Sequence, residues 1–562
     1  MSDTKSPSGA VFQSGSSTEG DSNQHGALSP PYLGPNMIDG SNPSDSASDE
    51  KIVEHRGQSE SQYSPYMNGY ALMQMKSRAS LKSKAYMVND LKDEYIGGLY
   101  ILPMDDPRRP HNWSLRKRLA HTVAYGVTTL TAQFGASVLS PTSEQISEQF
   151  EVGSEVGVLA FCIYLIGNMF GPALFAPVSE LYGRKAGVLM PCFVGSVLLC
   201  VCAVVDDIAA LVVFRFLAGV FTAAPIAASG GSMADLWTAN DRAAAMVLYA
   251  ANIMIGAVGS PVLGALLVGT GSYGWRWASW LCALLCMVVS VFNLIFLSES
   301  FVPVIEQRVA RHMRLDTGYW NLHTDHDKWH ITFQEFVQVH LMRPILMLVT
   351  PIVFCMAFFA SFVFGLLYIL ITSTGAQFRE VYGFTYAASY CPLFGYFSGY
   401  LFGGAVNIMN SRRYARLTNE VGHKLPPEQR LWAMMICAWF LPAGMFLYGW
   451  TMRPDIFWIV PCVGLGMCGV GLSVVFQGAL VYLVDVYEVY AASSVAANTM
   501  LRCLASGVFA LFSNQLYNGL GPGWASTLLG IILAVMVPIP WVFYFFGEKI
   551  RKRDPFRKQL SQ

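Results

Sequence analysis

Long stretches without charged side chains dominate the chain from Leu119 onward. Each stretch is long enough for a helix to cross about 30 Å of hydrocarbon, and a helix satisfies its own backbone hydrogen bonds inside a bilayer. We therefore expect twelve membrane-spanning helices. They are predicted at 119–140, 156–178, 186–205, 208–234, 243–269, 277–298, 345–371, 383–408, 431–452, 456–484, 490–517 and 524–546.

A long polar segment divides these helices into two sets of six. The pattern predicts an all-α membrane protein made of two pseudo-symmetric six-helix bundles. Residues 1–105 are rich in Ser, Gly, Pro, Asn and Asp, so we expect a disordered cytoplasmic tail there. The other predicted parts are an N-terminal bundle at 106–299, a cytoplasmic loop at 300–343, a C-terminal bundle at 344–548 and a cytoplasmic tail at 549–562.

The composition of the chain agrees with a bilayer as its solvent. Charged residues make up 13% of the 562 residues, whereas soluble domains carry roughly 25%. The net charge is zero, and we expect no nucleic-acid partner. The twelve cysteines show neither a C-x-x-C pair nor zinc-site spacing and lie in apolar stretches. We interpret them as small hydrophobic side chains and expect no metal and no cofactor.

Basic residues gather in alternate loops, which sets the expected orientation. The loops that hold the surplus contain Arg108, Arg109, Arg116, Lys117, Arg118, Arg184, Lys185, Arg242, Arg308, Arg311, Arg314, Lys328, Arg343, Arg412, Arg413, Arg416, Lys424, Arg430, Lys549, Arg551, Lys552 and Arg553. The intervening loops hold few basic residues, and the first of them is acidic. By the positive-inside rule, both termini are expected in the cytoplasm. The glycosylation sequon at Asn112 would then stay unmodified.

The loop between helices two and three has the chemistry of a conformational switch. Gly183 allows a tight turn there. Glu180, Arg184 and Asp235 are placed to form a charge cluster at the cytoplasmic ends of helices two and four, next to Lys185. An ion pair that breaks and re-forms at this point would bias two conformations. The alternative is that the basic residues of the loop only orient the chain in the membrane.

The second half of the chain repeats parts of this pattern. Helix ten ends at Asp485, as helix four ends at Asp235. The pair Arg412-Arg413 follows helix eight, as Arg184-Lys185 follows helix two. Such internal repeats are typical of transporters in which one half rocks against the other.

Two arginines fall inside predicted helices. A guanidinium in hydrocarbon is costly unless it faces a wet cavity or polar groups, so we interpret Arg215, with Gly219 one turn later, as part of a functional site. The alternative is that Arg215 snorkels to the outer interface. Arg502 poses the same question nearer the cytoplasmic end, and there we favour a structural role.

Helix five combines small residues with an internal proline. Gly256, Gly259 and Gly264 permit close helix packing, and Pro261 removes one internal hydrogen bond and bends the helix. We interpret this segment as a pivot or a seal between the two halves. The alternative is ordinary packing of small residues in a membrane helix.

Several polar or aromatic residues of the predicted helices are candidates to line a cavity. They are Gln133, Asn252, Tyr368, Tyr386, Tyr390, Gln477, Tyr482 and Asn498. Aromatic side chains would suit an amphipathic or cationic organic ligand, although each of them could instead pack between helices or face lipid. The chain contains no phosphate-binding G-x-x-x-x-G-K-[ST] sequence and no nucleophile motif, which disfavours an ATP-driven pump and an enzyme.

These motifs together resemble the signatures of the major facilitator superfamily. The resemblance rests on Arg184 with Gly183 and Glu180, on Arg215 with Gly219, and on Pro261 with its glycines. It is closest to the fungal twelve-helix drug:proton antiporters and extends from Asp106-Pro107 to the C-terminus. Where family members often have proline, glycine and glycine in helix five, this chain has Ala257, Ser260 and Ala265.

The resemblance implies proton-coupled export of lipophilic or cationic organic molecules, usually at the plasma membrane. We expect a monomer that binds a small molecule and protons. No carboxylate lies deep in a predicted helix, so the sequence names no proton carrier. Two alternatives stay open: an importer of polyamines or nutrients with the same fold, and a membrane sensor that does not transport.

Overall fold

The computed structural model describes residues 99–554, except 239–240, 269–273, 329–333, 335, 423–424 and 488–489. All of these residues belong to one compact unit, Pro65–Gln562. The tail predicted at 1–105 therefore lies almost wholly outside the described residues.

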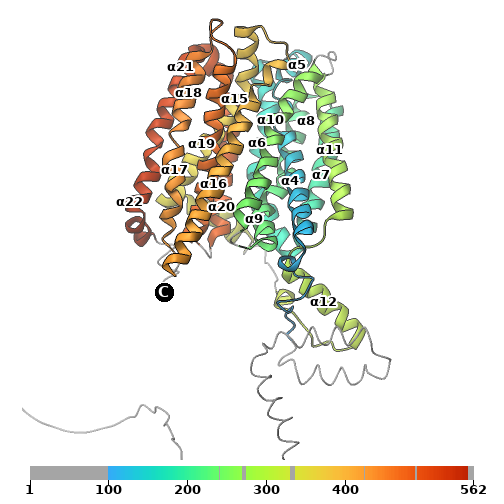
Figure 1. Cartoon of the computed structure of the whole chain (residues 1–562). Coiled ribbons are helices and arrows are strands. Elements are labelled where there is room, and N and C mark those ends of the chain that lie inside the picture. The colour runs from blue at the N-terminus through green and yellow to red at the C-terminus, as the bar shows by residue number, and fades with distance from the viewer. Residues whose placement is uncertain are drawn as a thin grey trace, which may run out of the picture. The chain divides into compact units, whose positions relative to one another are not determined.

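Among the described residues, the helices form twelve passages of the membrane-spanning part; Figure 1 shows their arrangement. The first half contains α4 (Leu115–Ser137), α6 (Ser154–Leu181), α7 (Arg184–Val204), α8 (Ile208–Thr222) continued by α9 (Ala224–Leu236), α10 (Arg242–Val268) and α11 (Gly274–Phe296). The second half contains α15 (Pro351–Tyr382), α16 (Leu393–Val421), η7 (Pro427–Leu431) with α17 (Trp432–Cys437) and α18 (Phe440–Thr451), α19 (Ile459–Tyr487), α20 (Ala491–Leu511), α21 (Ser513–Met536) and α22 (Pro538–Arg553).

Ten helical stretches among the described residues are long and apolar enough to cross a membrane. The two passages outside that set are α4 and α16, whose ends carry clustered basic residues such as Arg116 and Arg412. Within α21, Gly521 has φ 72° and ψ 164°, so the helix breaks there. Passage eleven therefore runs from α20 into the start of α21, and passage twelve continues from Pro522 into α22. The predicted fold of twelve helices in two bundles is confirmed.

The positions of helices seven and eight differ from the prediction. The sequence predicts 345–371 and 383–408, whereas α15 and α16 begin and end several residues later. The apolar residues near 345 instead form the short helix α14 (Arg343–Leu348). The far end of α15 is polar yet helical, because Ser373, Thr374 and Gln377 are buried and hydrogen-bonded, for example by the Tyr448 hydroxyl to Gln377 Oε1 at 2.8 Å.

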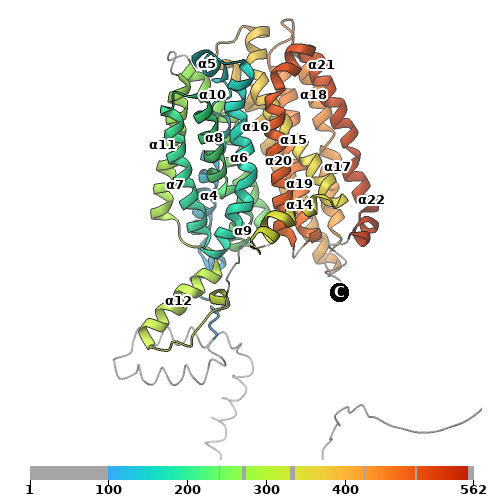
Figure 2. The same ribbon diagram turned by 180° about the vertical axis from the view of Figure 1, so that it is seen from behind.

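Equivalent helices of the two halves pack in the same way. In the first half α4 packs on α10, α6 on α8, and α7 on α11. In the second half the corresponding pairs are α15 on α20, α16 on α19, and α18 on α21. The halves meet along α6 with α20 and along α10 with α16. This repeated pattern is the pseudo-symmetry expected of two related bundles (Figure 2).

Different short helices lie at the two ends of the bundle. The short helix α5 (Ser143–Gln149) lies at one end, which we call the α5 end (Figure 1). The amphipathic helix α12 (Val302–Thr317) lies at the opposite end, the α12 end, together with the C-terminal end of α22. Helix α12 has its own small core, in which Val309, Ala310 and Met313 pack against Tyr100 and Leu102. The remaining short elements are η3 (Pro110–Asn112), η4 (Asp325–Lys328), η5 (Phe336–Met342) and η6 (Ala388–Tyr390).

Candidate functional site

An arginine-centred cluster lies at the α12 end of the first half. Arg184, the first residue of α7, donates from Nε to Asp235 Oδ2 of α9 at 3.0 Å. Its Nη1 donates to Ser179 Oγ of α6 at 3.1 Å, and its guanidinium lies 4.7 Å from the ring centroid of Phe301. A single side chain thus connects the ends of three helices. The sequence prediction that Arg184 and Asp235 meet corresponds to this geometry.

Glu299 completes the cluster by capping α7. Its Oε1 accepts the backbone N–H of Arg184 at 2.9 Å, and its Oε2 accepts the N–H of Lys185 at 3.3 Å. A carboxylate at a helix N-terminus also interacts favourably with the helix dipole. Gly183 precedes the helix with φ 95°, and a Cβ there would lie 2.3 Å from Glu299 Oε2. The turn therefore requires glycine, both for its backbone conformation and for space.

Two further residues of the predicted switch have different surroundings. Lys185 extends its Nζ to the carbonyl oxygen of Leu294 at 2.8 Å. Glu180 is partly buried and interacts electrostatically with Arg184 and Asp235, but the described residues give it no direct ion pair. Glu299, which directly follows the sixth predicted helix in the sequence, takes the capping position.

A matching cluster lies at the α12 end of the second half. Arg430 of η7 pairs with Asp485 at the end of α19, and its guanidinium lies 4.0 Å from the ring centroid of Tyr414. Arg551 of α22 pairs with Glu428 at 3.1 Å. Because Arg430 lies in η7 at the start of passage nine, as Arg184 lies at the start of passage three, Arg430 is its structural equivalent. The sequence suggested that Arg412-Arg413 is the counterpart of Arg184-Lys185 in the second half, whereas in the structure the counterpart of Arg184 is Arg430.

Arg215 of α8 is fully buried inside the first half. Its Nη2 donates to the carbonyl oxygen of Gly135 in α4 at 3.1 Å, and its Nε donates to that of Ala160 in α6 at 3.3 Å. The guanidinium also lies 4.9 Å from the ring centroid of Tyr164. These contacts hold Arg215 within the bundle and argue against snorkelling. One turn later, a Cβ on Gly219 would lie 2.3 Å from the Tyr164 carbonyl oxygen, so α8 and α6 are in close contact.

The small residues of α10 face two different environments. A Cβ on Gly256 would lie 2.4 Å from the carbonyl oxygen of Leu130, and one on Gly264 would lie 2.3 Å from that of Val138. Both glycines therefore allow α10 to pack tightly on α4. A Cβ on Gly259 would meet nothing within 4 Å. Pro261 lies between these positions, inside the helix.

Two hydrogen bonds described by the structure join the halves of the bundle. The Tyr368 hydroxyl of α15 donates to Gln133 Oε1 of α4 at 3.0 Å. The Tyr386 hydroxyl donates to the carbonyl oxygen of Pro141 at 2.6 Å, and Arg379 lies over the Tyr386 ring at 4.2 Å. Tyr386 and Pro141 lie in the loops at the α5 end, whereas Tyr368 lies near the middle of α15, so the two contacts join the halves at the α5 end and at mid-depth.

The other residues predicted to line a cavity make different kinds of contact in the structure. Asn252 donates to the carbonyl oxygen of Leu248 in its own helix at 2.9 Å, and Tyr390 packs against Gly375. Tyr482 lies against the ring of Phe543 in α22, with centroids 6.2 Å apart. Gln477 interacts with the Tyr400 hydroxyl, and Asn498 is fully buried. Sequence reasoning missed Tyr164 and Tyr400, because a single tyrosine in an apolar run carries no signal of its partner.

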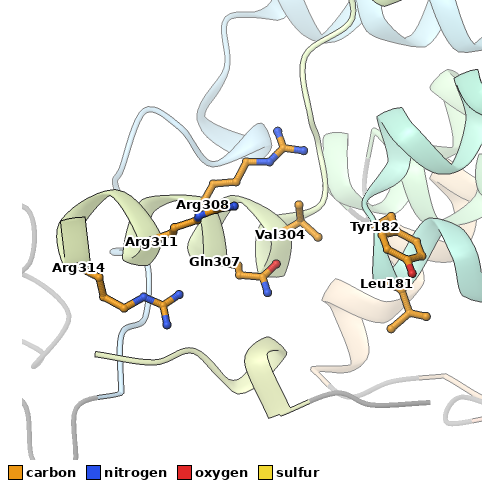
Figure 3. Close-up of a pocket in the computed structure, with 7 residues that line it drawn as sticks. All are labelled: Leu181, Tyr182, Val304, Gln307, Arg308, Arg311 and Arg314. Carbon is orange, nitrogen blue, oxygen red and sulfur yellow. The ribbon is translucent and has the colours of Figure 1, made fainter. Parts of the chain in front are cut away.

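A separate basic pocket lies beside α12 (Figure 3). Its volume is about 280 Å³, and it is lined by Leu181, Tyr182, Val304, Gln307, Arg308, Arg311 and Arg314. Two of its arginines already face acids, because Arg308 lies 3.8 Å from Glu299 and Arg314 lies 3.8 Å from Asp327. Elsewhere, the described residues contain no group of three His, Cys, Asp or Glu side chains that could hold a metal ion.

Comparisons with known proteins agree on one family. The family model described as Major Facilitator Superfamily matches residues 125–510. The "Efflux pump bik6" of Gibberella fujikuroi is 34% identical over 454 residues, which cover 81% of this chain and 93% of that protein. The "Major facilitator superfamily multidrug transporter FLU1" of Candida albicans is 32% identical over 456 residues, which cover 80% and 75%. The "Citrinin biosynthesis cluster MFS transporter mrr1" of Monascus ruber is 33% identical, covering 82% and 92%.

Solved structures share the fold at low sequence identity. The proton:xylose symporter XylE, bound to 6-bromo-6-deoxy-D-glucose, is similar with a TM-score of 0.55 and 14% identity, covering 77% of this chain and 97% of that chain. The human organic anion transporter MFSD10 has a TM-score of 0.51 and 16% identity, covering 76% and 100%. At such identities the likeness concerns the fold alone.

Proposed function

Because this chain belongs to the major facilitator superfamily, we propose that it is a proton-coupled exporter of amphipathic organic molecules. The chain is a multi-pass membrane transporter of small molecules and not an enzyme. Relatives named as an efflux pump and as a multidrug transporter support export as the direction. Substrate would enter between the halves from the cytoplasm, and protons moving inward would drive the return of the empty transporter.

The distribution of polar contacts between the halves is the observation that carries this proposal. The described hydrogen bonds between halves lie at mid-depth, from Tyr368 to Gln133, and at the α5 end, from Tyr386 to Pro141. The ion pairs at the α12 end, Arg184 with Asp235 and Arg430 with Asp485, each lie within one half. A conformation tied between halves at one end only is what alternating access requires. Each neutral hydrogen bond contributes only about 1 kcal/mol net, so substrate and protons can shift the equilibrium.

The clusters at the α12 end would control this rocking motion. Arg184 with Asp235, and Arg430 with Asp485, keep the helix ends of each half together as rigid units. Glu180 would add a titratable group beside the first pair. Helix α10, with tight glycine contacts on α4 and Pro261 between them, would serve as the pivot.

The positive-inside rule assigns the α12 end to the cytoplasm. In this orientation both termini are cytoplasmic, and the α5 end faces outward. We place the transporter in the plasma membrane as a monomer. Export from that membrane would draw on the inward proton gradient.

A reconstituted system tests the direction and the coupling. The purified chain would be inserted into liposomes with an imposed pH gradient, and movement of rhodamine 123 would be followed by fluorescence. We expect dye to move against the proton flow and to stop when a protonophore collapses the gradient. Dye movement in the same direction as protons would indicate an importer. Absence of any gradient-dependent movement of dyes would contradict proton-coupled export.

A further inference from the structure

The two arginines buried within the membrane differ in their partners. Arg215 donates to two backbone carbonyl oxygens. Arg502 of α20 is only 4% exposed, and its Nε has no hydrogen-bond partner. Among the described residues, its guanidinium makes neither a hydrogen bond nor an ion pair. Its recorded contacts are with the faces of two aromatic rings, Phe364 of α15 at 4.4 Å and Phe476 of α19 at 5.0 Å.

The depth of Arg502 makes this lack of partners costly. Arg502 follows Ala491, the first residue of α20, by eleven positions, which is about 17 Å along a helix. That distance is close to half of a hydrocarbon core of about 30 Å. A charge at this depth is stable only with a partner of opposite charge or with several polar groups. Contacts with aromatic faces supply part of this stabilisation.

A second unpartnered polar side chain lies one helical turn from Arg502. Asn498 is fully buried, and neither its Oδ1 nor its Nδ2 has a hydrogen-bond partner. Residues four apart lie on the same face of a helix, so Asn498 and Arg502 present their groups together. The hydroxyl of Tyr400 lies within electrostatic range of Arg502, and Gln477 lies beside Tyr400 with its Nε2 unpartnered. Three polar side chains, Asn498, Tyr400 and Gln477, therefore gather near one uncompensated positive charge.

Among the residues that the structure describes, no acidic side chain lies at this depth. No Asp or Glu occurs within the interior of any of the twelve passages, and the nearest acids in sequence, such as Asp485, lie at helix ends. Asp485 is already paired with Arg430. A negative charge from a bound molecule would compensate Arg502.

We propose that Arg502, Asn498, Gln477 and Tyr400 form a binding site for the anionic group of the substrate, such as a carboxylate or an enolate. The guanidinium would hold two oxygens of the anion, and the Asn498 and Gln477 amides would donate further hydrogen bonds. Phe364 and Phe476 would contact the aromatic part of the same molecule. This inference rests on the proposed export function and adds amphipathic organic acids to the substrates of that transporter, beside cationic dyes.

Two xanthene dyes of similar shape and opposite charge test the site. Binding of fluorescein, an anion, and of rhodamine 123, a cation, would be measured by fluorescence anisotropy with the purified full chain in lipid nanodiscs. We expect the wild-type chain to bind fluorescein, Arg502→Gln to weaken that binding at least tenfold, and Arg502→Lys to weaken it less. Rhodamine binding should not weaken in Arg502→Gln. Unchanged fluorescein affinity in Arg502→Gln, or no fluorescein binding by the wild-type chain, would overturn the inference.

Asn498→Asp separates a binding role of Arg502 from a structural one. This substitution places a carboxylate one turn from Arg502, where it can form an internal ion pair. We expect the melting temperature to stay equal or rise while fluorescein binding is lost, because the internal carboxylate occupies the site. Retained fluorescein binding in this variant would overturn the inference. Rhodamine export in the liposome assay tests the proposed function separately, so either idea can fail alone.

Discussion

Arg215 links the packing of single residues to the function of the first half. Its guanidinium, on α8, donates to backbone carbonyl oxygens of α4 and α6. A hydrogen bond to a charged group contributes about 1.5–3 kcal/mol, so this residue fixes the relative positions of three helices. Without it, the carbonyl oxygens of Gly135 and Ala160 would lose their charged donor.

We expect Arg215→Ala to lower dye export about tenfold or more, because losing even one charge-assisted hydrogen bond costs about 1.5 kcal/mol. Cells that express the variant should accumulate more rhodamine 123 than cells that express the wild-type chain. Arg215→Lys is the matched control, since one ammonium cannot reach both carbonyl oxygens as a guanidinium does, and its effect should be intermediate. Equal accumulation in all three strains, at equal expression, would count against a role for Arg215.

The sequence revealed that two arginines lie within the membrane, but it did not reveal which groups form hydrogen bonds with each guanidinium. The partners of Arg215 are backbone atoms 55 and 80 residues away, which leave no trace in side-chain identity. Arg502 looked structural because it seemed near a helix end, whereas α20 places it about half-way through the bilayer. The absence of partners around Arg502 became visible only in the packed bundle.

Helix ends are held together by ion pairs at equivalent positions in the two halves. Arg184 with Asp235 joins α7 to α9, and Arg430 with Asp485 joins η7 to α19. All four side chains are mostly buried. Removing one partner of a buried pair leaves an uncompensated charge, which costs more than removing both.

Neutralising these pairs should therefore show strong coupling. We expect Arg184→Gln and Asp235→Asn each to reduce transport, and the double variant to be less impaired than the sum of the two. The coupling free energy should be about 0.5–3 kcal/mol, measured from melting temperatures and initial export rates in a double-mutant cycle. The cycle for Arg430 and Asp485 should give the same sign. Additive effects in both cycles would show that the pairs do not act as units.

Glycines along α10 allow a matched test of the proposed pivot. Gly264→Ala would push a methyl group against the Val138 carbonyl oxygen of α4, so export should slow and the melting temperature should fall. Gly259→Ala meets nothing within 4 Å and should leave both measurements nearly unchanged. If both variants behaved alike, the close contact between α10 and α4 would not be important for transport.

At the scale of helices, hydropathy located ten of the twelve passages well and predicted the other two, α15 and α16, several residues too early in the chain. The boundaries of α15 and α16 depend on buried polar residues such as Gln377, which a hydrophobic window treats as loop. The loop before α16 is aromatic, so it resembled the beginning of a helix. The equivalence between helices of the first half and helices of the second half, by contrast, follows from the internal repeat in the sequence once two six-helix units are recognised.

Considered as a whole, the molecule consists of two similar bundles in contact along α6 with α20 and along α10 with α16. Close contact at α20 depends on Gly507, where a Cβ would lie 2.8 Å from Ile166 Cγ1 of α6. The described hydrogen bonds between halves lie at mid-depth and at the α5 end, and the ion pairs of the α12 end lie within each half. Rigid halves with breakable contacts between them are suited to rocking.

Distances across the two ends of the bundle test this rocking most directly. Spin labels on unnatural amino acids, which avoid the twelve native cysteines, would be placed at exposed Glu148 and Asp455 for the α5 end and at exposed Thr238 and Glu420 for the α12 end. Pulsed electron resonance would then record both distances as pH and substrate are varied. We predict that the first distance lengthens as the second shortens. Distances that change together, or that never change during active transport, would contradict alternating access.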